Sequence, residues 1–200
     1  MIYPIPPRNT FGKSSTAYSE GFLSQEDISL LLAQPEWQNL QAGCVSGAGG
    51  ANEINEQLRI TDIAWVDLKP EIAHIWEKFA GAVAEVNSRY FHYDLTGIHE
   101  PMQLAVYTGQ KQGHYNWHID ASPDDRYTPR KLSIVMLLSD PSEFEGGELQ
   151  VKTHNYEAQT LECKKGRAWF FPSYMLHRVA PVTNGVRRSL VFWAGGPAFR

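Results

Sequence analysis

The segment 113–120 (GHYNWHID) carries the first candidate metal ligands of the chain, His118 and Asp120. On a β-strand, side chains two residues apart leave the same face, so this imidazole and this carboxylate are expected to converge. His177, in the segment FPSYMLHRV, offers a third ligand. Two histidines and one carboxylate on one face form the facial triad that holds non-haem Fe(II) and leaves other coordination positions open. The sequence therefore predicts an iron site made of His118, Asp120 and His177.

The pattern His-x-Asp occurs a second time, as His92, Tyr93 and Asp94. This copy follows directly on a predicted long helix, in a segment (RYFHYDLTGIHEP) with weak strand character. His118 instead lies inside a predicted strand that has other strands near it, where a later histidine can lie opposite. We therefore favour His118 and Asp120 as the ligand pair.

The strand-like run RRSLVFW begins at Arg187, ten residues after His177. Both of its faces are apolar beyond Ser189, so we expect this strand to be buried, and Arg187 with it. A buried arginine needs an anion. Two kinds of anion stay open. One is a carboxylate of the core, such as that of Glu148, and the other is the distal carboxylate of a dicarboxylic co-substrate, which fits the fork of donors that arginine offers.

Hydroxyl groups near Arg187 are candidate partners for the same co-substrate carboxylate. Ser189 lies two residues further along the strand, on the same face, whereas Arg188 points the opposite way and can stay in solvent. Tyr107 ends the run QLAVY and could supply another hydroxyl, although an amphipathic core tyrosine fits that position equally well. If the anion is a co-substrate, Arg187, Ser189 and Tyr107 are the candidate residues that bind it.

The composition is that of an ordinary globular domain, with 200 residues, 42% hydrophobic and 20% charged. A formal net charge of -4, with 18 scattered Lys and Arg, gives no basic surface for nucleic acid and favours a small or neutral partner. Cys44 and Cys163 are too few for a disulfide framework, so we expect a reducing compartment. No window reaches the ~18 apolar residues of a membrane span, and the N-terminus lacks a signal pattern. We expect a cytoplasmic protein with no membrane contact.

The second half of the chain, from residue 102, consists of short apolar runs broken by glycine, proline, asparagine and aspartate. Because these runs follow helices rather than alternate with them, they indicate an antiparallel sandwich or barrel. We infer a jelly roll in a mainly β chain of the α+β class, with the N-terminal helices packed on one sheet. The runs are QLAVY, HYNWHI, LSIVMLL, GELQV, AQTLEC, RAWFF, HRVAPV and VRRSLVFW.

The first hundred residues are expected to support this barrel within a single domain of residues 1–200, whose motifs lie in 101–200. Residues 1–19 suit an extended arm, and Ser24 with Asp27 suits the start of a short helix that Pro35 stops. Apolar residues at steps of three and four predict a long helix from about residue 70 to 90. The segment 59–68 suits a strand, and the glycine-rich segment 43–52 suits a mobile loop that could act as a lid.

The motifs in the second half together resemble the Fe(II)/2-oxoglutarate-dependent dioxygenases. They are most similar to the prolyl 4-hydroxylase-like branch and its bacterial and phage PKHD-type hydroxylase relatives. The resemblance covers roughly residues 100–195, while the first hundred residues match no motif of this kind. It is carried by Tyr107, the segment 113–120, EGGEL at 145–149, FPS before His177, and HRVAPVTNGVRRSL at 177–190.

This resemblance implies a double-stranded β-helix core, Fe(II) on His118, Asp120 and His177, and 2-oxoglutarate bound by Arg187 and Tyr107. Many prolyl hydroxylases carry lysine at the position of Arg187, so arginine favours the bacterial relatives. The implied reaction hydroxylates a C–H bond with O2 as co-substrate and ascorbate as a supporting reductant, and decarboxylates 2-oxoglutarate to succinate and CO2. Both histidines must be neutral to bind metal, so activity should fall as the pH drops through the imidazole range.

The prime substrate is the least defined part of this expectation. The family suggests peptidyl proline, and free amino acids, other protein side chains and small metabolites stay open. Two further alternatives are a cupin-like metal enzyme that uses no 2-oxoglutarate, and a non-catalytic jelly roll that binds a peptide or a sugar. Asn116 shares the strand phase of His118, and Arg126 and Tyr127 lie in the loop after Asp120, so these three residues are candidate substrate contacts. By the same alternation, Tyr115 and Trp117 should face away from the site.

Overall fold

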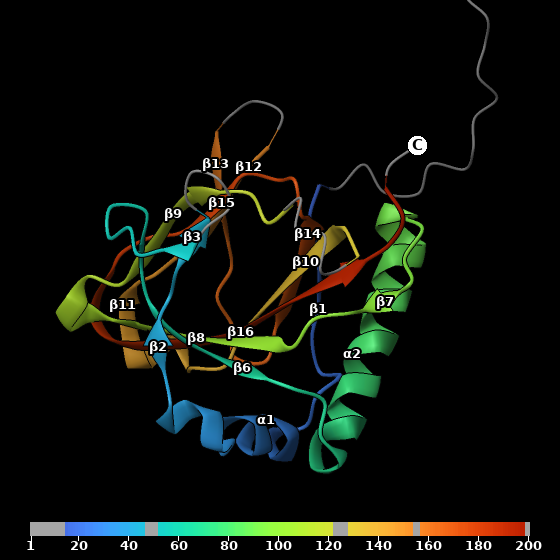
Figure 1. Cartoon of the computed structure of the whole chain (residues 1–200), viewed down its shortest axis with the longest axis horizontal. Helices are drawn as coiled ribbons and strands as arrows, with labels where there is room; N and C mark the ends of the chain where they lie inside the picture. Colours follow the sequence, from blue (N-terminus) through green and yellow to red (C-terminus); the bar gives the residue numbers. More distant parts are fainter. Residues whose placement is uncertain (1–14, 47–51, 122–127, 154–156, 199–200) are drawn as a thin grey trace, which may run out of the picture.

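The computed structural model describes residues 15–46, 52–121, 128–153 and 157–198, which form two facing antiparallel sheets and two α-helices (Figure 1). The larger sheet has nine strands, with the order β1-β14-β10-β16-β8-β6-β2 and with β7 and β11 paired to β16. Its strands are β1 (Ala17–Ser19), β2 (Gln41–Ala42), β6 (Asp62–Val66), β7 (Gly97–Ile98), β8 (Met102–Thr108), β10 (Arg130–Leu137), β11 (Phe144–Gly146), β14 (Ala168–Pro172) and β16 (Val182–Gly195).

The smaller sheet has five strands in the order β13-β12-β15-β9-β5. Along the second half of the chain, successive strands are divided between the two sheets, as in a jelly roll. Each of the eight apolar runs overlaps a strand of one of the two sheets, so the predicted jelly roll is confirmed. The run HRVAPV is divided between β15 and β16, and the short strand β11 was not expected. The strands of this sheet are β5 (Arg59–Ile60), β9 (His114–His118), β12 (Leu149–Lys152), β13 (Ala158–Leu161) and β15 (His177–Val179).

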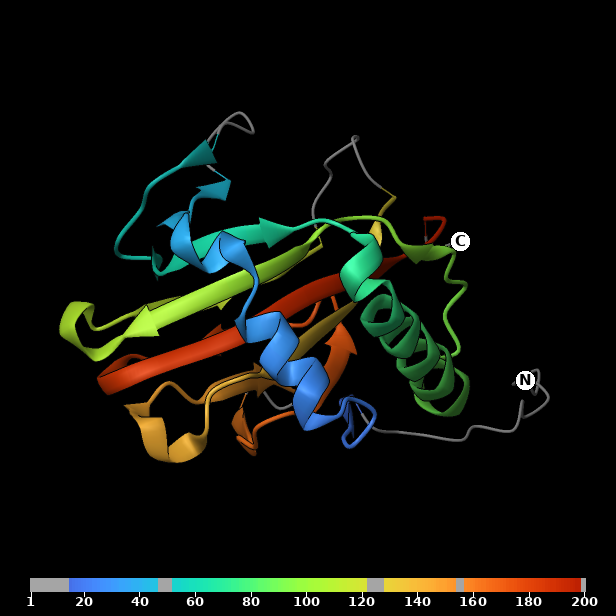
Figure 2. The same cartoon turned by 90° about the horizontal axis from the view of Figure 1, so that it is seen from below.

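Both helices cover the outer face of the larger sheet, as the sequence predicts (Figure 2). They are α1 (Gln25–Leu32) and α2 (Ala73–Val86). Phe79 of α2 packs edge-on against Phe192 of β16, with ring centroids 4.5 Å apart. The expected start of α1 is a capping box, in which Asp27 N donates to Ser24 Oγ and Ser24 N donates to Asp27 Oδ2. This layer leaves the other face of the sheet free to meet the smaller sheet.

The predicted strand over 59–68 is wrong as a single element, because the chain changes sheets within it. Arg59 and Ile60 form β5 beside β9, whereas β6 begins at Asp62 and lies beside β8. Thr61 lies at the step, and its hydroxyl donates to the carbonyl oxygen of Val106 at 2.9 Å. This hydrogen bond inside the fold explains the interrupted alternation of the sequence. The step brings Arg59 to the space between the two sheets.

The ends of two predicted loops carry short strands. Residues 17–19 of the expected arm form β1 at the edge of the larger sheet, paired with β14, and residues 1–14 lie outside the described residues. In the glycine-rich segment, β3 (Val45–Ser46) pairs with β4 (Asn52–Glu53), and residues 47–51 between them also lie outside the described part. Its expected role as a lid stays a prediction.

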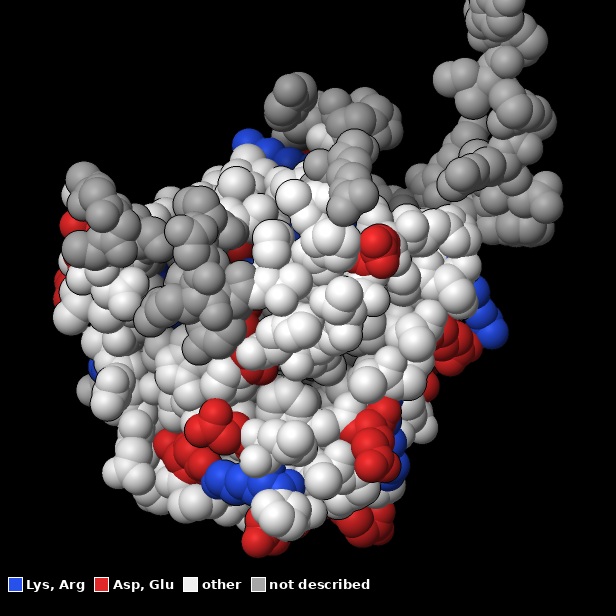
Figure 3. Space-filling model, turned by 45° about the vertical axis from the view of Figure 1, so that its right-hand side comes forward, with Lys and Arg blue, Asp and Glu red and all other residues white. Residues whose placement is uncertain are grey.

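Acidic and basic side chains are interspersed on the surface. On the face in Figure 3, most of the Lys and Arg lie next to Asp or Glu. Ion pairs of the described residues include Lys78 with Asp27 and Arg167 with Glu20. Among the helices of the described residues, none has the length and apolar character that crossing a membrane requires.

Candidate metal centre

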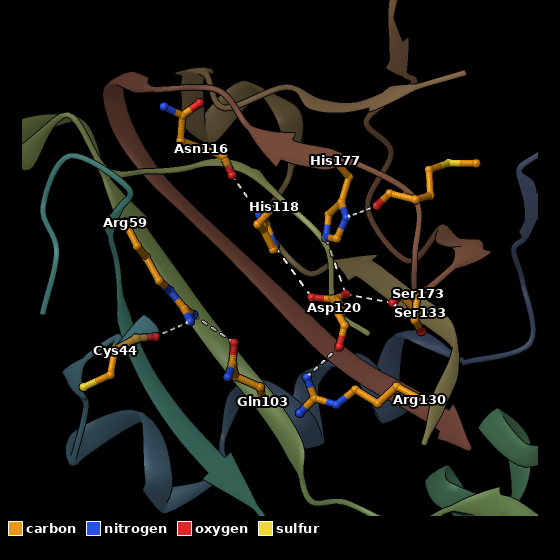
Figure 4. Close-up of polar contacts among 11 residues, drawn as sticks. Cys44, Arg59, Gln103, Asn116, His118, Asp120, Arg130, Ser133, Ser173 and His177 are labelled. Atoms are coloured by element: carbon orange, nitrogen blue, oxygen red, sulfur yellow. Dashed lines mark hydrogen bonds and ion pairs between the residues drawn. The ribbon is translucent and has the colours of Figure 1, made fainter. Parts of the chain in front are cut away.

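Three potential metal ligands from separate parts of the chain meet between the two sheets (Figure 4). His118 ends β9 and His177 begins β15, and the two residues are direct partners in the antiparallel register. Asp120 lies two residues beyond β9, with Oδ1 3.6 Å from His118 Nε2 and Oδ2 3.4 Å from His177 Nε2. One ligand atom from each residue lies within 4.8 Å of the others. The structure therefore brings together the residues that the sequence predicts.

Backbone carbonyl groups orient both imidazole rings. His118 Nδ1 lies 2.7 Å from the carbonyl oxygen of Asn116, and His177 Nδ1 lies 2.9 Å from that of Met175. Because a carbonyl oxygen only accepts, each Nδ1 carries the proton and donates it. Each Nε2 then keeps its lone pair, and this atom is the one that faces Asp120. A metal ligand needs this tautomer, so the protein prepares both rings for a cation.

The carboxylate of Asp120 is held by two serines that sequence analysis did not single out. Ser133 Oγ donates to Asp120 Oδ2 at 2.7 Å and lies 3.0 Å from Ser173 Oγ, and the backbone N–H of Asp120 donates to the carbonyl oxygen of Ser173. Burial alone would raise the pKa of Asp120, but His177 and His118 together lower it below its ordinary value. The group is therefore an anion at neutral pH. A serine inside the apolar run LSIVMLL was the available signal for Ser133.

Burial has the opposite effect on His177, because it penalises the charged imidazolium. It lowers the pKa of His177 from 6.5 to about 4, although Asp120 acts to raise it. The expected loss of metal binding across the ordinary imidazole range therefore does not hold for His177 in the folded protein. At neutral pH this site combines one anion with a neutral His177, which is the protonation state that a divalent cation requires.

Metal-free protein should lose stability as the pH falls from 6.5 to 4, the window set by the pKa of His177. In this window the unfolded chain binds a proton that the folded chain does not, so the free energy of unfolding decreases toward acid, by up to about 3 kcal/mol. Urea unfolding in the presence of a chelator, at several pH values, measures this slope. His177→Gln should flatten it, while His92→Gln, at an exposed position, should leave it unchanged. An equal slope in His177→Gln would contradict the assignment.

Arg187 lies on β16 of the larger sheet and is only 1% exposed. Its Nη1 donates to Ser189 Oγ at 3.0 Å, and its Nε has no hydrogen-bond partner among the described residues. Burial lowers the pKa of Arg187, and in the part of the chain that the structure describes no ion pair connects it to Glu148 or another carboxylate. Of the two anions that the sequence left open, the core carboxylate is therefore not found there.

Glycine in the EGGEL segment makes room for this arginine. Gly147 has φ +67°, and a Cβ at this position would lie 2.9 Å from Arg187 Cδ and 2.8 Å from Val182 Cγ2. A larger residue would thus meet both a strained backbone and the arginine side chain. Arg188, by contrast, is half-buried, with Nη1 3.8 Å from Glu143 Oε2.

A cavity of about 180 Å³ lies in front of the three ligands. Tyr107 and Ser189 line it, so Ser189 stands between Arg187 and the open space. Its other walls combine aromatic and aliphatic side chains with polar and charged ones. Such a small cavity, with polar groups set among apolar ones, suits a small co-substrate beside the metal.

Tyr115 also lines this cavity, so the prediction from strand alternation that it faces away is wrong. Its ring stacks on His118, with centroids 3.4 Å apart and an angle of 10° between the planes. The cause is an irregular register, in which His118 pairs with His177 but Tyr115 pairs with Val179. Three residues along β9 thus span the same length as two residues along β15. This β-bulge turns the side chain of Tyr115 to the same side as that of His118. Burial raises the pKa of Tyr115 to about 12, so its hydroxyl stays protonated.

Two further cations border the same space and were not found from the sequence. Arg59 lies in the cavity wall with its guanidinium over the ring of Tyr115, 4.4 Å from the centroid. Arg130 forms an ion pair with Glu100, lies 3.6 Å from the ring centroid of Trp193, and donates weakly to the carbonyl oxygen of Asp120. Figure 4 shows both guanidinium groups approaching the three ligands from different sides.

Within its described residues, the structure does not place the side chains of the three candidate substrate contacts in the cavity. The side chain of Asn116 is exposed, and its contribution to the site is the backbone carbonyl that orients His118. Arg126 and Tyr127 lie outside the described residues, so their roles stay predictions. The second His-x-Asp pattern lies at the end of α2, where His92 has a left-handed backbone with φ 55° and both His92 and Asp94 are exposed.

Comparisons with known proteins agree with this site. The model of the 2OG-Fe(II) oxygenase superfamily matches residues 102–195. A PKHD-type hydroxylase of Escherichia coli is 27% identical over 96% of this chain and 77% of its own length. A prolyl-4-hydroxylase of Pseudomonas putida has a TM-score of 0.71 at 19% identity, covering 93% of this chain and 95% of its own.

A second solved structure is a prolyl hydroxylase from Trichoplax adhaerens, in complex with a peptide fragment of hypoxia inducible factor. It has a TM-score of 0.72 at 20% identity, covering 92% of this chain and 84% of its own. At these identities the two structures show a shared fold, and the sequence matches show similarity to the PKHD-type hydroxylases.

The segment that matches the family model contains His118, Asp120 and His177, which converge in the structure, and Arg187, whose partner Ser189 lines the same cavity. Two imidazoles and an anionic carboxylate fit Fe(II), and a buried guanidinium that lacks a carboxylate partner among the described residues fits a dicarboxylic co-substrate. Residues 102–195 therefore match the 2OG-Fe(II) oxygenase superfamily, the chain is similar to PKHD-type hydroxylases, and the residues of its metal centre fit Fe(II) and 2-oxoglutarate as cofactors.

Proposed function

We propose that His118, Asp120 and His177 hold the Fe(II) of this hydroxylase, and that Arg187 anchors the distal carboxylate of 2-oxoglutarate with help from Ser189 and Tyr107. The observation that carries this assignment is the buried guanidinium of Arg187, which has donors to spare and no carboxylate beside it in the described structure. A buried cation is costly without an anion, so a diacid that binds here removes a penalty that the fold otherwise retains.

The protein residues mainly bind, orient and exclude water. Arg187 and Ser189 hold one end of 2-oxoglutarate at the back of the cavity, so that its other end points toward the three ligands. The carbonyls of Asn116 and Met175 keep the two Nε2 atoms directed at the metal, and the stacked ring of Tyr115 holds the His118 ring in place. When bound, Fe(II) and 2-oxoglutarate supply the oxidising chemistry, in which O2 is reduced, 2-oxoglutarate becomes succinate and CO2, and one oxygen atom enters a C–H bond.

We propose that the prime substrate is a peptide and that its hydroxylated residue is proline. The names of the solved relatives support this, since one is a prolyl-4-hydroxylase and another was solved with a peptide fragment. A second cavity of about 600 Å³ adjoins the metal cavity and shares Arg59, Trp65 and Gln103 with it, which gives room for residues that flank the reacting one. Trp65 is 42% exposed there and offers an aromatic surface to such a chain.

We also propose that residues 1–200 work as one catalytic domain in the cytoplasm. The free thiols of Cys44 and Cys163 suit a reducing compartment.

Anaerobic titration tests the metal and co-substrate assignments together. Addition of Fe(II) and then 2-oxoglutarate should produce a metal-to-ligand charge-transfer absorption band that requires both additions, because only a chelating keto acid on the metal creates it. Under air the same protein should release succinate, and a peptide screen for succinate formation then identifies the prime substrate. A cupin-like metal enzyme would bind Fe(II) without a band on adding 2-oxoglutarate. A non-catalytic jelly roll would show neither response.

A further inference from the structure

Arg59 is the second buried arginine of this chain whose charge the described structure leaves without a carboxylate. It is 6% exposed, similar to Arg167 at 7%. Arg167 is neutralised by Glu20 and Glu162, and Arg130, on the far side of the metal cavity, is neutralised by Glu100. The ion pairs found among the described residues include none for Arg59. Its charge is therefore unbalanced in the same sense as that of Arg187.

Neutral groups hold the guanidinium of Arg59. Nη1 donates to the carbonyl oxygen of Cys44 at 3.2 Å and Nη2 donates to Gln103 Oε1 at 2.9 Å, so two of its five N–H donors are used. The ring of Tyr115 adds a cation–π contact. Such a contact is worth less than the desolvation penalty of a buried cation, so these groups position the charge but do not compensate it.

The side chain is also fixed in direction. A Cβ on Gly43 would lie 2.6 Å from Arg59 Nε, so the glycine allows the backbone to lie against the guanidinium on one side. Tyr115 covers one of its faces, and Gln103 and Cys44 hold its tip. A rigid cation loses little entropy on binding an anion.

The position of Arg59 makes it accessible to a ligand of the metal site. It lines the metal cavity together with His118, Asp120 and His177, and it also lines the adjoining cavity of about 600 Å³. In Figure 4 the guanidinium of Arg59 lies on the His118 side of the three ligands, away from His177. Arg187 lies behind Ser189, so the two cations serve different parts of the site.

We propose that Arg59 binds a carboxylate of the prime substrate and so selects anionic substrates. This rests on the proposed function, in which Arg187 takes the carboxylate of 2-oxoglutarate and the three ligands take the metal. In a peptide the carboxylate belongs to an Asp or Glu that flanks the hydroxylated residue and extends into the adjoining cavity. In a free acid it is the carboxylate of the reacting molecule itself. Both sources present the same planar group to the fork of Arg59.

Matched probes separate the carboxylate from the rest of the substrate. The peptide probes are acetylated, amidated peptides in which proline is flanked by Asp, or by Asn in the control, and the small probes are N-acetylproline and its amide. Binding is measured by calorimetry on protein loaded with Mn(II) and 2-oxoglutarate, and hydroxylation is measured on the Fe(II) enzyme. The carboxylate probe of at least one pair should bind at least about 10-fold more tightly than its amide.

Arg59→Gln should remove this preference while leaving 2-oxoglutarate affinity unchanged, and Arg59→Lys, which keeps the charge but not the fork, should retain part of it. Arg178→Gln is the matched control, because Arg178 is bonded to Gln150 Oε1 on the outer part of the smaller sheet. Thermal unfolding shows whether each variant is folded. If Arg59→Gln fails to fold, the Arg59→Lys variant and the wild-type ratio of acid to amide decide the question.

Equal binding of acid and amide by the wild type would overturn the proposal for Arg59. So would a variant that weakens both members of a pair equally, or one that weakens 2-oxoglutarate. If N-acetylproline shows the Arg59-dependent preference and neither peptide binds, the carboxylate site stands and the peptide substrate is wrong. If the Asn and Asp peptides are bound and hydroxylated equally, and N-acetylproline binds no better than its amide, the peptide substrate stands and the anion site is wrong.

Discussion

Asp120→Asn is expected to lower the Fe(II) affinity by more than about 100-fold and to abolish turnover of 2-oxoglutarate. Loss of groups that merely orient a metal ligand costs about 10- to 100-fold, so loss of the ligand charge itself should cost more. The asparagine keeps the shape and can still accept from Ser133 at the Oδ2 position, but its amide N–H groups would then replace Oδ1 and face Nε2 of His118. They would donate to a lone pair that the metal needs. Equilibrium Fe(II) titration and succinate release measure the two effects.

The second His-x-Asp pattern provides the matched control for this experiment. Asp94→Asn and His92→Ala change the same residue types in the same local pattern, at exposed positions beside the end of α2. Both variants should bind Fe(II) and turn over 2-oxoglutarate as the unaltered protein does. Retention of Fe(II) affinity in Asp120→Asn, or an equal loss in Asp94→Asn, would contradict the assignment of the metal site.

The metal ligands could be predicted because their chemistry is local. His118 and Asp120 are two residues apart, and the ending of a strand before Asp120 does not alter their convergence. His177 could be added because a histidine after a buried strand and a proline turn is unusual in an apolar region. That His118 and His177 are direct partners in the register is a property of the whole fold, since β9 and β15 are brought together by the division of strands between two sheets.

The residues that sequence analysis missed depend on departures from regular structure. Tyr115 enters the cavity because β9 has a bulge, and strict alternation has no means of showing an extra residue. Arg59 reaches the cavity because the chain changes sheets at Thr61, whose hydroxyl bonds to a distant carbonyl oxygen. Both features depend on pairing with strands far along the chain. A pattern read along one segment therefore places the ligands but not the walls of the site.

The buried arginines show a further limit of the sequence. The burial of Arg187 could be predicted because it begins an apolar strand. Arg59 is followed by Ile60 and then by polar residues, so its neighbours in the sequence do not predict burial. Only the structure shows that both are buried and that, among the described residues, no ion pair joins either of them to a carboxylate. A buried charge without an ion-pair partner in the structure therefore identifies candidate binding residues that the local sequence pattern does not.

Arg187→Met is expected to raise the KM for 2-oxoglutarate by about 30-fold to several thousandfold. Truncating one partner of a buried charge pair costs about 2–5 kcal/mol, and the variant loses both the charge and the fork that would grip the distal carboxylate. The charge-transfer band should need correspondingly more 2-oxoglutarate, while Fe(II) affinity stays unchanged because Arg187 is not a metal ligand. Spectroscopic titration and steady-state kinetics measure these effects separately. The KM of Arg187→Lys for 2-oxoglutarate should lie between those of the parent protein and Arg187→Met, since lysine keeps the charge.

Stability distinguishes this binding role from a structural one. In the described structure the buried guanidinium has Ser189 as a partner but no anion, so replacing it by an apolar side chain of similar length removes a desolvation penalty. Metal-free Arg187→Met should therefore be as stable as the parent protein or more stable, even though it binds 2-oxoglutarate poorly. Arg188→Met, at the next position and half-exposed near Glu143, should change neither property. A large loss of stability in Arg187→Met with unaltered 2-oxoglutarate affinity would show that Arg187 supports the core and that the co-substrate binds elsewhere.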